Sequence, residues 1–155
     1  MHPTTHARWT RLCAGLILVA GLTGAAANGQ PAGQPAPKDP NVGDVRVDAK
    51  TGALNPVQTT STPPSGDSTR NSTAHIAAHP TGKWVYGSNR GHDSIARFNV
   101  DPSTGWLRFA EATPSGGKTP RNFSLDPTGK WLLAAHQDSN SVVVQKIPLS
   151  SSTAN

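Results

Sequence analysis

One stretch of this chain occurs twice, and the repeat limits the folds that the chain can adopt. The sequence HPTGKWVYGSNR begins at His79, and the related sequence DPTGKWLLAAHQ begins 47 residues later, at Asp126. Each copy opens with a turn, because proline presets its φ angle and glycine tolerates the closing geometry. Aromatic and β-branched residues follow the turn at His79, and these favour a strand. The repeated unit therefore consists of a turn, a strand, a second turn and a second strand.

A second match within the chain sets the length of the repeat. The segment 47–54 matches the segment 100–107 at an offset of 53 residues. The six extra residues fit a longer loop within 61–72. The apolar residues show no helical period. Repeats of about 40 to 50 residues that contain four short strands are typical of β-propeller blades.

The alternation of apolar residues predicts three groups of strands. These are 44–48 and 53–60; then 73–78, 83–88, 94–100 and 106–113; then 121–125, 130–136 and 141–147. The predicted fold class is all-β, with antiparallel four-stranded propeller blades in an incomplete ring. An arc of blades leaves two apolar faces in water. At about 25 cal/mol per Å² of apolar area, a bare face lowers the stability of the fold by on the order of ten kcal/mol. We expect such a chain to be marginally stable or to find partners, with self-association through the exposed blade faces as one outcome.

The first residues of the chain read as a segment for export. Arg8 and Arg11 precede an apolar run, 12–22, that is too short to span a bilayer, and small residues follow it. This order is typical of a secretory signal peptide over 1–27, with a signal helix, removed on export to the periplasm or the exterior. The alternative for the apolar run is a buried core helix.

The remaining chain divides into a linker, a domain and a tail. Residues 28–43 are rich in proline and glycine and are expected to form a disordered linker. The partial propeller covers 44–147, and 148–155 form a flexible tail. Within the partial propeller we expect a blade end over 44–60, a full blade over 73–115 and a partial blade over 120–147.

Composition argues against several classes of partner. Cys13 is the only cysteine and lies in the expected signal peptide, so the mature chain should contain neither a disulfide nor a cysteine-based metal site. The net charge of +5 comes from scattered basic residues, which does not favour nucleic-acid binding. We expect no cofactor, no metal and no membrane association after signal cleavage.

Five motifs of the domain are specific enough to compare with known families. They are Asn71–Ala74, His79–Lys83, Ser88–Ala96, Thr119–Phe123 and Gln137–Ser139. Together they resemble the later blades of the lactonase family of seven-bladed β-propellers, which includes the propeller type of 6-phosphogluconolactonase. The resemblance covers about 45–147, or about two of seven blades, and implies a longer parent. It also implies hydrolysis of a sugar lactone such as 6-phosphogluconolactone, a carboxylic ester hydrolysis.

The resemblance implies a set of binding residues. The family's arginines bind the carboxylate or phosphate of the substrate, and Arg90 and Arg121 stand in the matching motifs. Gln137 aligns with Arg90 within the repeat and would supply a neutral donor. The blades that carry the family's catalytic histidine and glutamate have no counterpart here, so the catalytic residues stay unknown. The resemblance also leads us to expect an acidic residue at position 75, where this chain has His75.

Strand direction offers a separate argument for the same site. In an antiparallel blade, the turn between the second and third strands and the connection to the next blade share one end of the ring. Arg90, Arg121 and Gln137 all fall at that end. The alternative for Arg90 is a structural bond to a neighbouring turn, through Asp93.

Other residues that could carry chemistry read as structural. His92 and His136 are interpreted as polar turn residues, and Trp84 and Trp131 as residues that pack between blades. Two functions stay open. The chain is either a member or fragment of a lactone hydrolase, or a non-catalytic exported propeller fragment that acts as a binding or assembly module.

Overall fold

The described part of the chain is built from strands alone. The computed structural model describes residues 16–20 and 41–148, and within these ranges it contains ten strands and no helix. In chain order the strands are β1 (Leu16–Ala20), β2 (Asn41–Val47), β3 (Leu54–Ser61), β4 (Ser72–Ala78), β5 (Trp84–Arg90), β6 (Ser94–Val100), β7 (Leu107–Pro114), β8 (Pro120–Leu125), β9 (Trp131–His136) and β10 (Ser141–Lys146).

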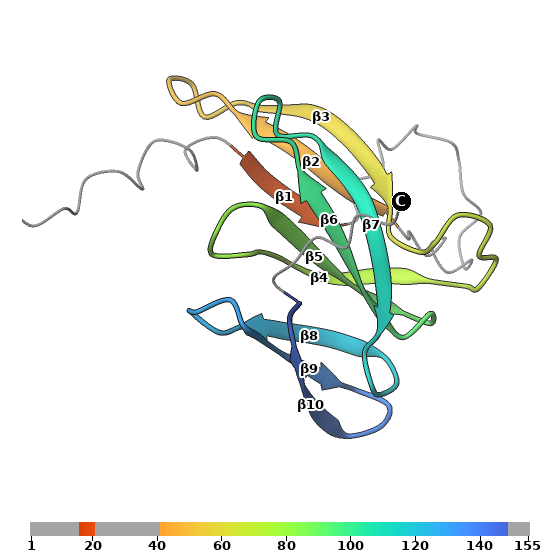
Figure 1. Ribbon diagram of the computed structural model, residues 1–155. Helices are drawn as coiled ribbons and strands as arrows, with labels where there is room; N and C mark the ends of the chain where they lie inside the picture. Colours follow the sequence, from red (N-terminus) through yellow and green to blue (C-terminus); the bar gives the residue numbers. More distant parts are fainter. Residues whose placement is uncertain (1–15, 21–40, 149–155) are drawn as a thin grey trace, which may run out of the picture.

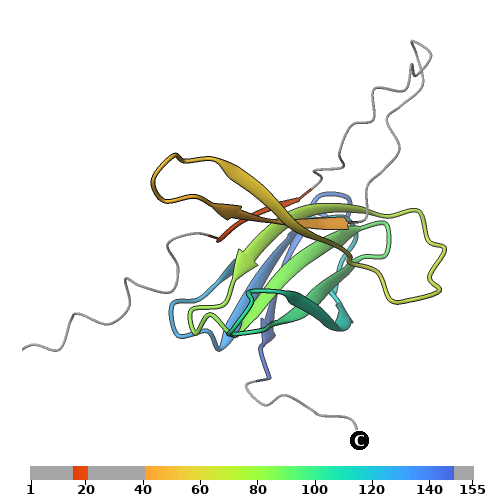
Figure 2. The same ribbon diagram turned by 90° about the horizontal axis from the view of Figure 1, so that it is seen from above.

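The strands form three antiparallel sheets, each made of consecutive strands. The orders are β1-β2-β3, β4-β5-β6-β7 and β8-β9-β10. Figure 1 shows the three sheets following one another in chain order, with the four-stranded sheet between the other two. The view from above in Figure 2 shows the β2–β3 hairpin lying across the middle sheet. This arrangement confirms the predicted all-β fold of propeller blades in an incomplete ring.

The strands predicted from the sequence agree with the observed strands to within three residues at every end. The segment 94–100 coincides with β6. One difference concerns the expected signal helix. Within 1–27 the structure describes only Leu16–Ala20, and these residues form β1 beside β2 instead of a helix. The edge of β2 offers unpaired backbone groups to an apolar segment, and a strand satisfies them while a helix does not.

The repeat in the sequence is also a repeat in the backbone. Gly82 closes the turn that His79 opens, with a 2.8 Å hydrogen bond from its N–H to the His79 carbonyl, and Gly129 closes the matching turn from Asp126 at 2.9 Å. Both glycines have positive φ angles, 72° and 71°. The β-bulges recur as well, since the bulge after Asp44 in the first sheet corresponds to the bulge after Arg97 in the second.

Two apolar clusters join the sheets. Between the first two sheets, Val42 packs with residues of the middle sheet that include Val85 and Phe98. On the other side of the middle sheet, Trp84, Tyr86 and Ile95 pack with residues of β8 and β9. The middle sheet is therefore buried on both faces, as an inner blade should be.

A polar contact reinforces the second of these junctions. The His79 ring accepts a hydrogen bond at Nδ1 from the Thr81 backbone N–H (3.2 Å). Its Nε2 lies 2.9 Å from the Gly129 carbonyl oxygen. Because a carbonyl can only accept, Nε2 carries the hydrogen and donates. The buried ring thereby links the corresponding turns of two neighbouring blades.

The two repeated tryptophans differ in environment. Trp84 is 8% exposed and packs edge-on against His79, as expected for a residue between blades. Trp131 is 44% exposed. The expectation that Trp131 packs between blades is therefore wrong for the described chain, because no described sheet covers its face of β9.

One buried carboxylate has no partner. Asp44 in β2 is 1% exposed, and neither of its oxygens has a hydrogen-bond partner among the described residues. Burial raises the pKa of Asp44 above 3.8, and the charge of Arg46 opposes this effect. An unpaired buried carboxylate destabilises the fold when it is ionised.

Candidate binding site

Arg121 and Gln137 lie together at one end of the third sheet. Arg121 is the extra residue of a β-bulge in β8, because Pro120 pairs with His136 and Asn122 pairs with Ala135. Bulges often redirect a side chain. The Arg121 side chain is exposed, and its Nη1 donates a 2.8 Å hydrogen bond to Oε1 of Gln137. The structure thus brings together two of the three predicted binding residues.

Backbone contacts across the neighbouring turns position Gln137. Its N–H donates to the Thr119 carbonyl at 3.0 Å. Next to it, the Asp138 carboxylate accepts a short hydrogen bond from the Thr119 hydroxyl. Thr119 itself adopts a positive φ of 58°. These contacts join the loop before β8 to the turn after β9, so Gln137 is held beside Arg121 at the open end of the β8–β9 hairpin.

An open hollow of about 710 Å³ lies at this place. It is lined by residues at the ends of β8 and β9 and the start of β10, which are Arg121, Asn122, Ala135, His136, Gln137, Asn140, Ser141 and Val142. Most of these side chains are polar, and Arg121 is the cation among them. Such a hollow suits a small polar ligand with a negative charge.

Arg90 lies on the neighbouring blade and does not line this hollow. Its Nη2 donates a 2.8 Å hydrogen bond to the Ser72 hydroxyl, and its Nε is buried without a hydrogen-bond partner among the described residues. The expected alternative, a bond to Asp93, is not what the structure shows. Within the described chain Arg90 therefore has a structural bond on one side and a free donor on the other.

Asp93 instead connects the two blades. Its carboxylate accepts a 2.8 Å hydrogen bond from the Thr119 N–H, and its carbonyl accepts one of 2.9 Å from the Ser115 N–H. The turn after Arg90 and the loop before Arg121 are thus in direct contact. This confirms that the two loops lie at the same end of the arc, although no described contact joins the two arginine side chains.

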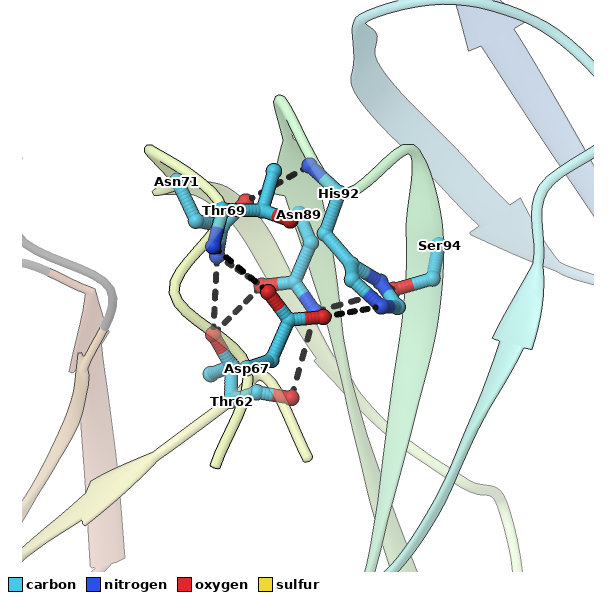
Figure 3. A network of polar contacts seen from close by, with 7 residues as sticks. All are labelled: Thr62, Asp67, Thr69, Asn71, Asn89, His92 and Ser94. Carbon is cyan, nitrogen blue, oxygen red and sulfur yellow. Dashed lines mark hydrogen bonds and ion pairs between the residues drawn. The ribbon is translucent and has the colours of Figure 1, made fainter. Parts of the chain in front are cut away.

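A polar network holds the turn that follows Arg90, as Figure 3 shows. Nε2 of His92 lies 3.0 Å from the Asp67 carboxylate, and its Nδ1 lies 2.7 Å from the Ser94 hydroxyl. The Asn71 amide donates to Oδ1 of Asn89 at 2.8 Å. Hydrogen bonds from Thr69, through its side chain and its backbone N–H, lower the pKa of Asp67. The network fixes the long loop between β3 and β4 against the β5–β6 turn.

Gly91 lets this loop approach the turn closely. Its φ is 117°, and a Cβ atom at this position would lie 2.1 Å from the Arg70 carbonyl oxygen. Only glycine fits such a backbone without displacing its neighbour. The glycine in the Ser-Asn-Arg-Gly motif is therefore required by the contact beside Arg90.

His136 and Ser115 form a buried pair that sequence reasoning did not identify. Nε2 of His136 lies 3.0 Å from Oγ of Ser115, and this hydroxyl donates to the Asp93 carbonyl at 2.8 Å. Because the single hydroxyl hydrogen is directed at that carbonyl, His136 donates to Ser115. Ser115 is fully buried, so the pair has the geometry of a structural contact rather than of a nucleophile and its base.

Other classes of site find no support in the described residues. No three His, Cys, Asp or Glu side chains among them are grouped to hold a metal ion. The described part of the chain also contains no helix that is long and apolar enough to cross a membrane. His75 stands where the family resemblance predicted an acidic residue. Its ring packs edge-on against Phe123, with ring centroids 4.9 Å apart.

The sheets and their order define a β-propeller arc. Residues 39–153 match the family model of the lactonase, 7-bladed β-propeller. The chain belongs to this lactonase family of seven-bladed β-propellers, which confirms the resemblance seen in its motifs.

Individual relatives agree with this assignment. The chain is similar to the 6-phosphogluconolactonase of Formosa agariphila, with 45% identity over 80 residues that cover 50% of this chain and 22% of the relative. It is also similar to the 6-phosphogluconolactonase of Bacillus subtilis, with 38% identity over 78 residues, 50% of this chain and 22% of the relative. The chain thus spans about a fifth of the length of these relatives.

Solved structures show the same likeness. The periplasmic gluconolactonase of Pseudomonas aeruginosa superimposes with a TM-score of 0.66 and 29% identity, over 72% of this chain and 31% of that structure. A protein from Lactobacillus plantarum gives a TM-score of 0.67 and 27% identity, over 71% of this chain and 32% of that structure.

Proposed function

We propose that this chain is part of a carboxylic ester hydrolase that acts on a sugar lactone such as 6-phosphogluconolactone, and that it contributes the binding of the anionic substrate. Membership of the lactonase family and the similarity to 6-phosphogluconolactonases support the reaction class. The observation that carries the binding role is the exposed guanidinium of Arg121, which Gln137 orients at the edge of the hollow.

The chemistry of a lactone assigns a task to these side chains. Hydrolysis adds water to the ring carbonyl and breaks the ring C–O bond, which leaves a hydroxyl and a carboxylate. A phosphate or carboxylate on the sugar suits the planar fork of an arginine. Arg121 would bind this anion with two of its N–H groups, while Gln137 keeps the guanidinium in place through its amide oxygen. Water activation is assigned to no residue of this chain.

Arg90 is proposed as a second anion-binding residue from the neighbouring blade. Its side chain is partly exposed, and a ligand oxygen could accept from the Nη group that does not bind Ser72. The bond from Nη2 to Ser72 would hold the guanidinium in place, while the buried Nε is out of reach of a ligand. The contact between Asp93 and Thr119 supports a shared site, because it joins the loops that carry the two arginines.

The second candidate function is a non-catalytic module for binding or assembly. The observation that favours it is the exposed apolar face of β9 and β10, where Val142 is 67% exposed. An exposed face of this kind is typical of an interaction surface.

We also propose that the chain is exported. The charged and apolar pattern of residues 1–27 supports a signal peptide. The likeness to a gluconolactonase described as periplasmic points in the same direction. Most of the expected signal peptide lies outside the described residues, which include only β1 from it. Most of the linker 28–43 and of the tail 148–155 also lies outside the described residues.

Binding of the reaction product tests the proposal directly. Isothermal titration of the full chain with 6-phosphogluconate should give a binding isotherm that Arg121→Ala weakens about tenfold or more, since a charge-assisted hydrogen bond is lost. Arg108→Ala is the matched control, because it removes an exposed arginine from β7, in another sheet. Equal affinity in all three proteins would remove Arg121 from the site. In an assay of lactone hydrolysis, equal rates for wild type and Arg90→Ala would remove Arg90 from the mechanism.

A further inference from the structure

One histidine in β4 has ring nitrogens that the fold does not use. In the part of the chain that the structure describes, His79, His92 and His136 each have a polar partner at both ring nitrogens. Neither ring nitrogen of His75 has a hydrogen-bond partner among the same residues. Its ring is half-buried and uses one side to pack edge-on against Phe123 of β8. The polar edge of this ring is therefore available to a ligand.

A β-bulge directs the His75 side chain. In the pairing of β4 with β5, Ala74 and His75 together lie opposite Ser88 alone. The Ser88 hydroxyl accepts a 3.0 Å hydrogen bond from the His75 backbone N–H, so the donor of the extra residue is satisfied. Ser88 is itself fully buried, which fixes the bulge. Bulges of this kind redirect a side chain, as the bulge at Arg121 does in β8.

The repeat relates this position to the hollow on the third sheet. Three positions that line the hollow recur on the middle sheet at the 47-residue offset. The corresponding pairs are His75 and Asn122, Ser88 and Ala135, and Arg90 and Gln137. The strand pairing agrees with this correspondence, since both bulges fall at the same place in their blades. The middle sheet therefore repeats the polar end of the hollow, with a histidine and an arginine in place of two amides.

His75 and Arg90 lie on the same face of the middle sheet. Tyr86 of β5 packs in one cluster with Phe123, so its face of the sheet is directed at the third sheet. Arg90 shares that face, because alternate residues of a strand point the same way. The contact of His75 with Phe123 places its ring on this face too. Arg121 precedes Phe123 by two residues, or about 7 Å along β8 at about 3.3 Å per residue.

We infer that His75 is a further ligand-binding residue of this site, which forms hydrogen bonds through its ring to a hydroxyl of the sugar acid. The inference rests on the proposed function, because it adds a residue to the site of Arg90 and Arg121. A neutral imidazole donates at one nitrogen and accepts at the other, and a sugar hydroxyl also both donates and accepts. His75 would hold the sugar, while the two arginines hold its anionic group.

Titration calorimetry of the full chain with 6-phosphogluconate separates the role of the ring from that of its nitrogens. His75→Phe keeps an aromatic ring against Phe123 and removes both nitrogens. We expect it to weaken binding about threefold to tenfold, as the loss of a hydrogen bond does. A residue that only packs against Phe123 would tolerate this substitution. Thermal unfolding of the variant shows whether the fold is kept.

A second measurement observes the ring itself in the wild-type chain. In ¹⁵N–¹H correlation spectra of the histidine side chains, the signals of His75 are identified by their absence from the spectrum of His75→Gln. These signals should shift when 6-phosphogluconate is added. The ring of His79 is the internal control and should not respond, because Thr81 and Gly129 already occupy its two nitrogens at the other end of β4.

The outcomes separate this inference from the proposed function. Equal affinity of wild type and His75→Phe, together with weaker binding by Arg121→Ala, would overturn the role of His75 and leave the proposed function standing. Ring signals of His75 that do not move with the ligand would overturn it as well, whatever the substitutions do to stability. A wild-type chain that does not bind 6-phosphogluconate would overturn both.

Discussion

Nη1 of Arg121 lies 2.8 Å from Oε1 of Gln137, the residue that takes the place of Arg90 in the repeat. The preceding blade forms the corresponding contact between Arg90 and Ser72. The second and third sheets therefore each hold one guanidinium at the same end of the arc, through a hydrogen bond to a side-chain oxygen. The exposed donors that remain on these two arginines could bind an anion.

The first prediction concerns the support that Gln137 gives to Arg121. Gln137→Leu should weaken the binding of 6-phosphogluconate by about threefold to tenfold, because the guanidinium loses its acceptor while keeping its charge. The fold should be unaffected, since both side chains are exposed. Titration calorimetry measures the affinity, and thermal unfolding supplies the control. An unchanged affinity would show that Arg121 needs no orientation by Gln137.

The second prediction compares the two repeated tryptophans. Trp84→Ala should lower the free energy of unfolding by about 3–5 kcal/mol, because it opens a cavity between two blades. Trp131→Ala should change it by no more than about 1 kcal/mol, since this side chain is partly exposed and leaves no enclosed cavity. Urea unfolding followed by circular dichroism measures both. A loss at Trp131 as large as that at Trp84 would mean that its face is covered in solution.

The third prediction follows from the buried carboxylate of Asp44. Its pKa in the folded chain is raised above 3.8, so the folded state binds this proton more readily than the unfolded chain does. The stability that this proton contributes is present below pH 3.8 and is lost as pH rises through the raised pKa. Asp44→Asn should therefore stabilise the chain at pH 7 by about 1–2 kcal/mol, and less at pH 4.

Asp48 provides a control of opposite sign. Hydrogen bonds from the backbone N–H groups of Thr51 and Lys50 lower the pKa of this exposed carboxylate. Its contribution to stability is present above pH 3.8 and is lost as pH falls through the lowered pKa. Asp48→Asn should therefore not stabilise the chain at pH 7. Equal effects of the two variants in urea unfolding would contradict the assignment of Asp44 as a buried unpaired charge.

The fourth prediction concerns the loop beside Arg90. Gly91→Ala should destabilise the chain by about 2 kcal/mol or more, because the added Cβ would meet the Arg70 carbonyl at 2.1 Å. Gly66→Ala is the matched control, since Gly66 also has a positive φ of 84° but nothing within 4 Å of the added atom. Limited proteolysis within 62–71 should accelerate in the first variant alone. Equal proteolysis would mean that the network around His92 does not hold the loop.

The repeat made the fold predictable to a large extent. The Pro-Thr-Gly turns, the strands that follow them and the positions of the site residues at one end of the arc are local or periodic properties. The bulge at Arg121 was not predicted, because nothing in the local sequence distinguishes an extra residue in a strand from a paired one. The Ser115–His136 pair was missed because its members come from different blades.

The turns, the strands and the family are readable from the amino-acid order alone, because they follow from backbone preferences and recognisable motifs; the anion-binding residues are a prediction from the same motifs. The contact of Gln137 with Arg121, the contact of Arg90 with Ser72, and the burial of Trp84 beside the exposure of Trp131 become visible only in the folded chain. They depend on which sheet lies against a given face, and a linear sequence does not specify that locally. Two related stretches of sequence therefore differ in burial according to whether a neighbouring sheet covers them.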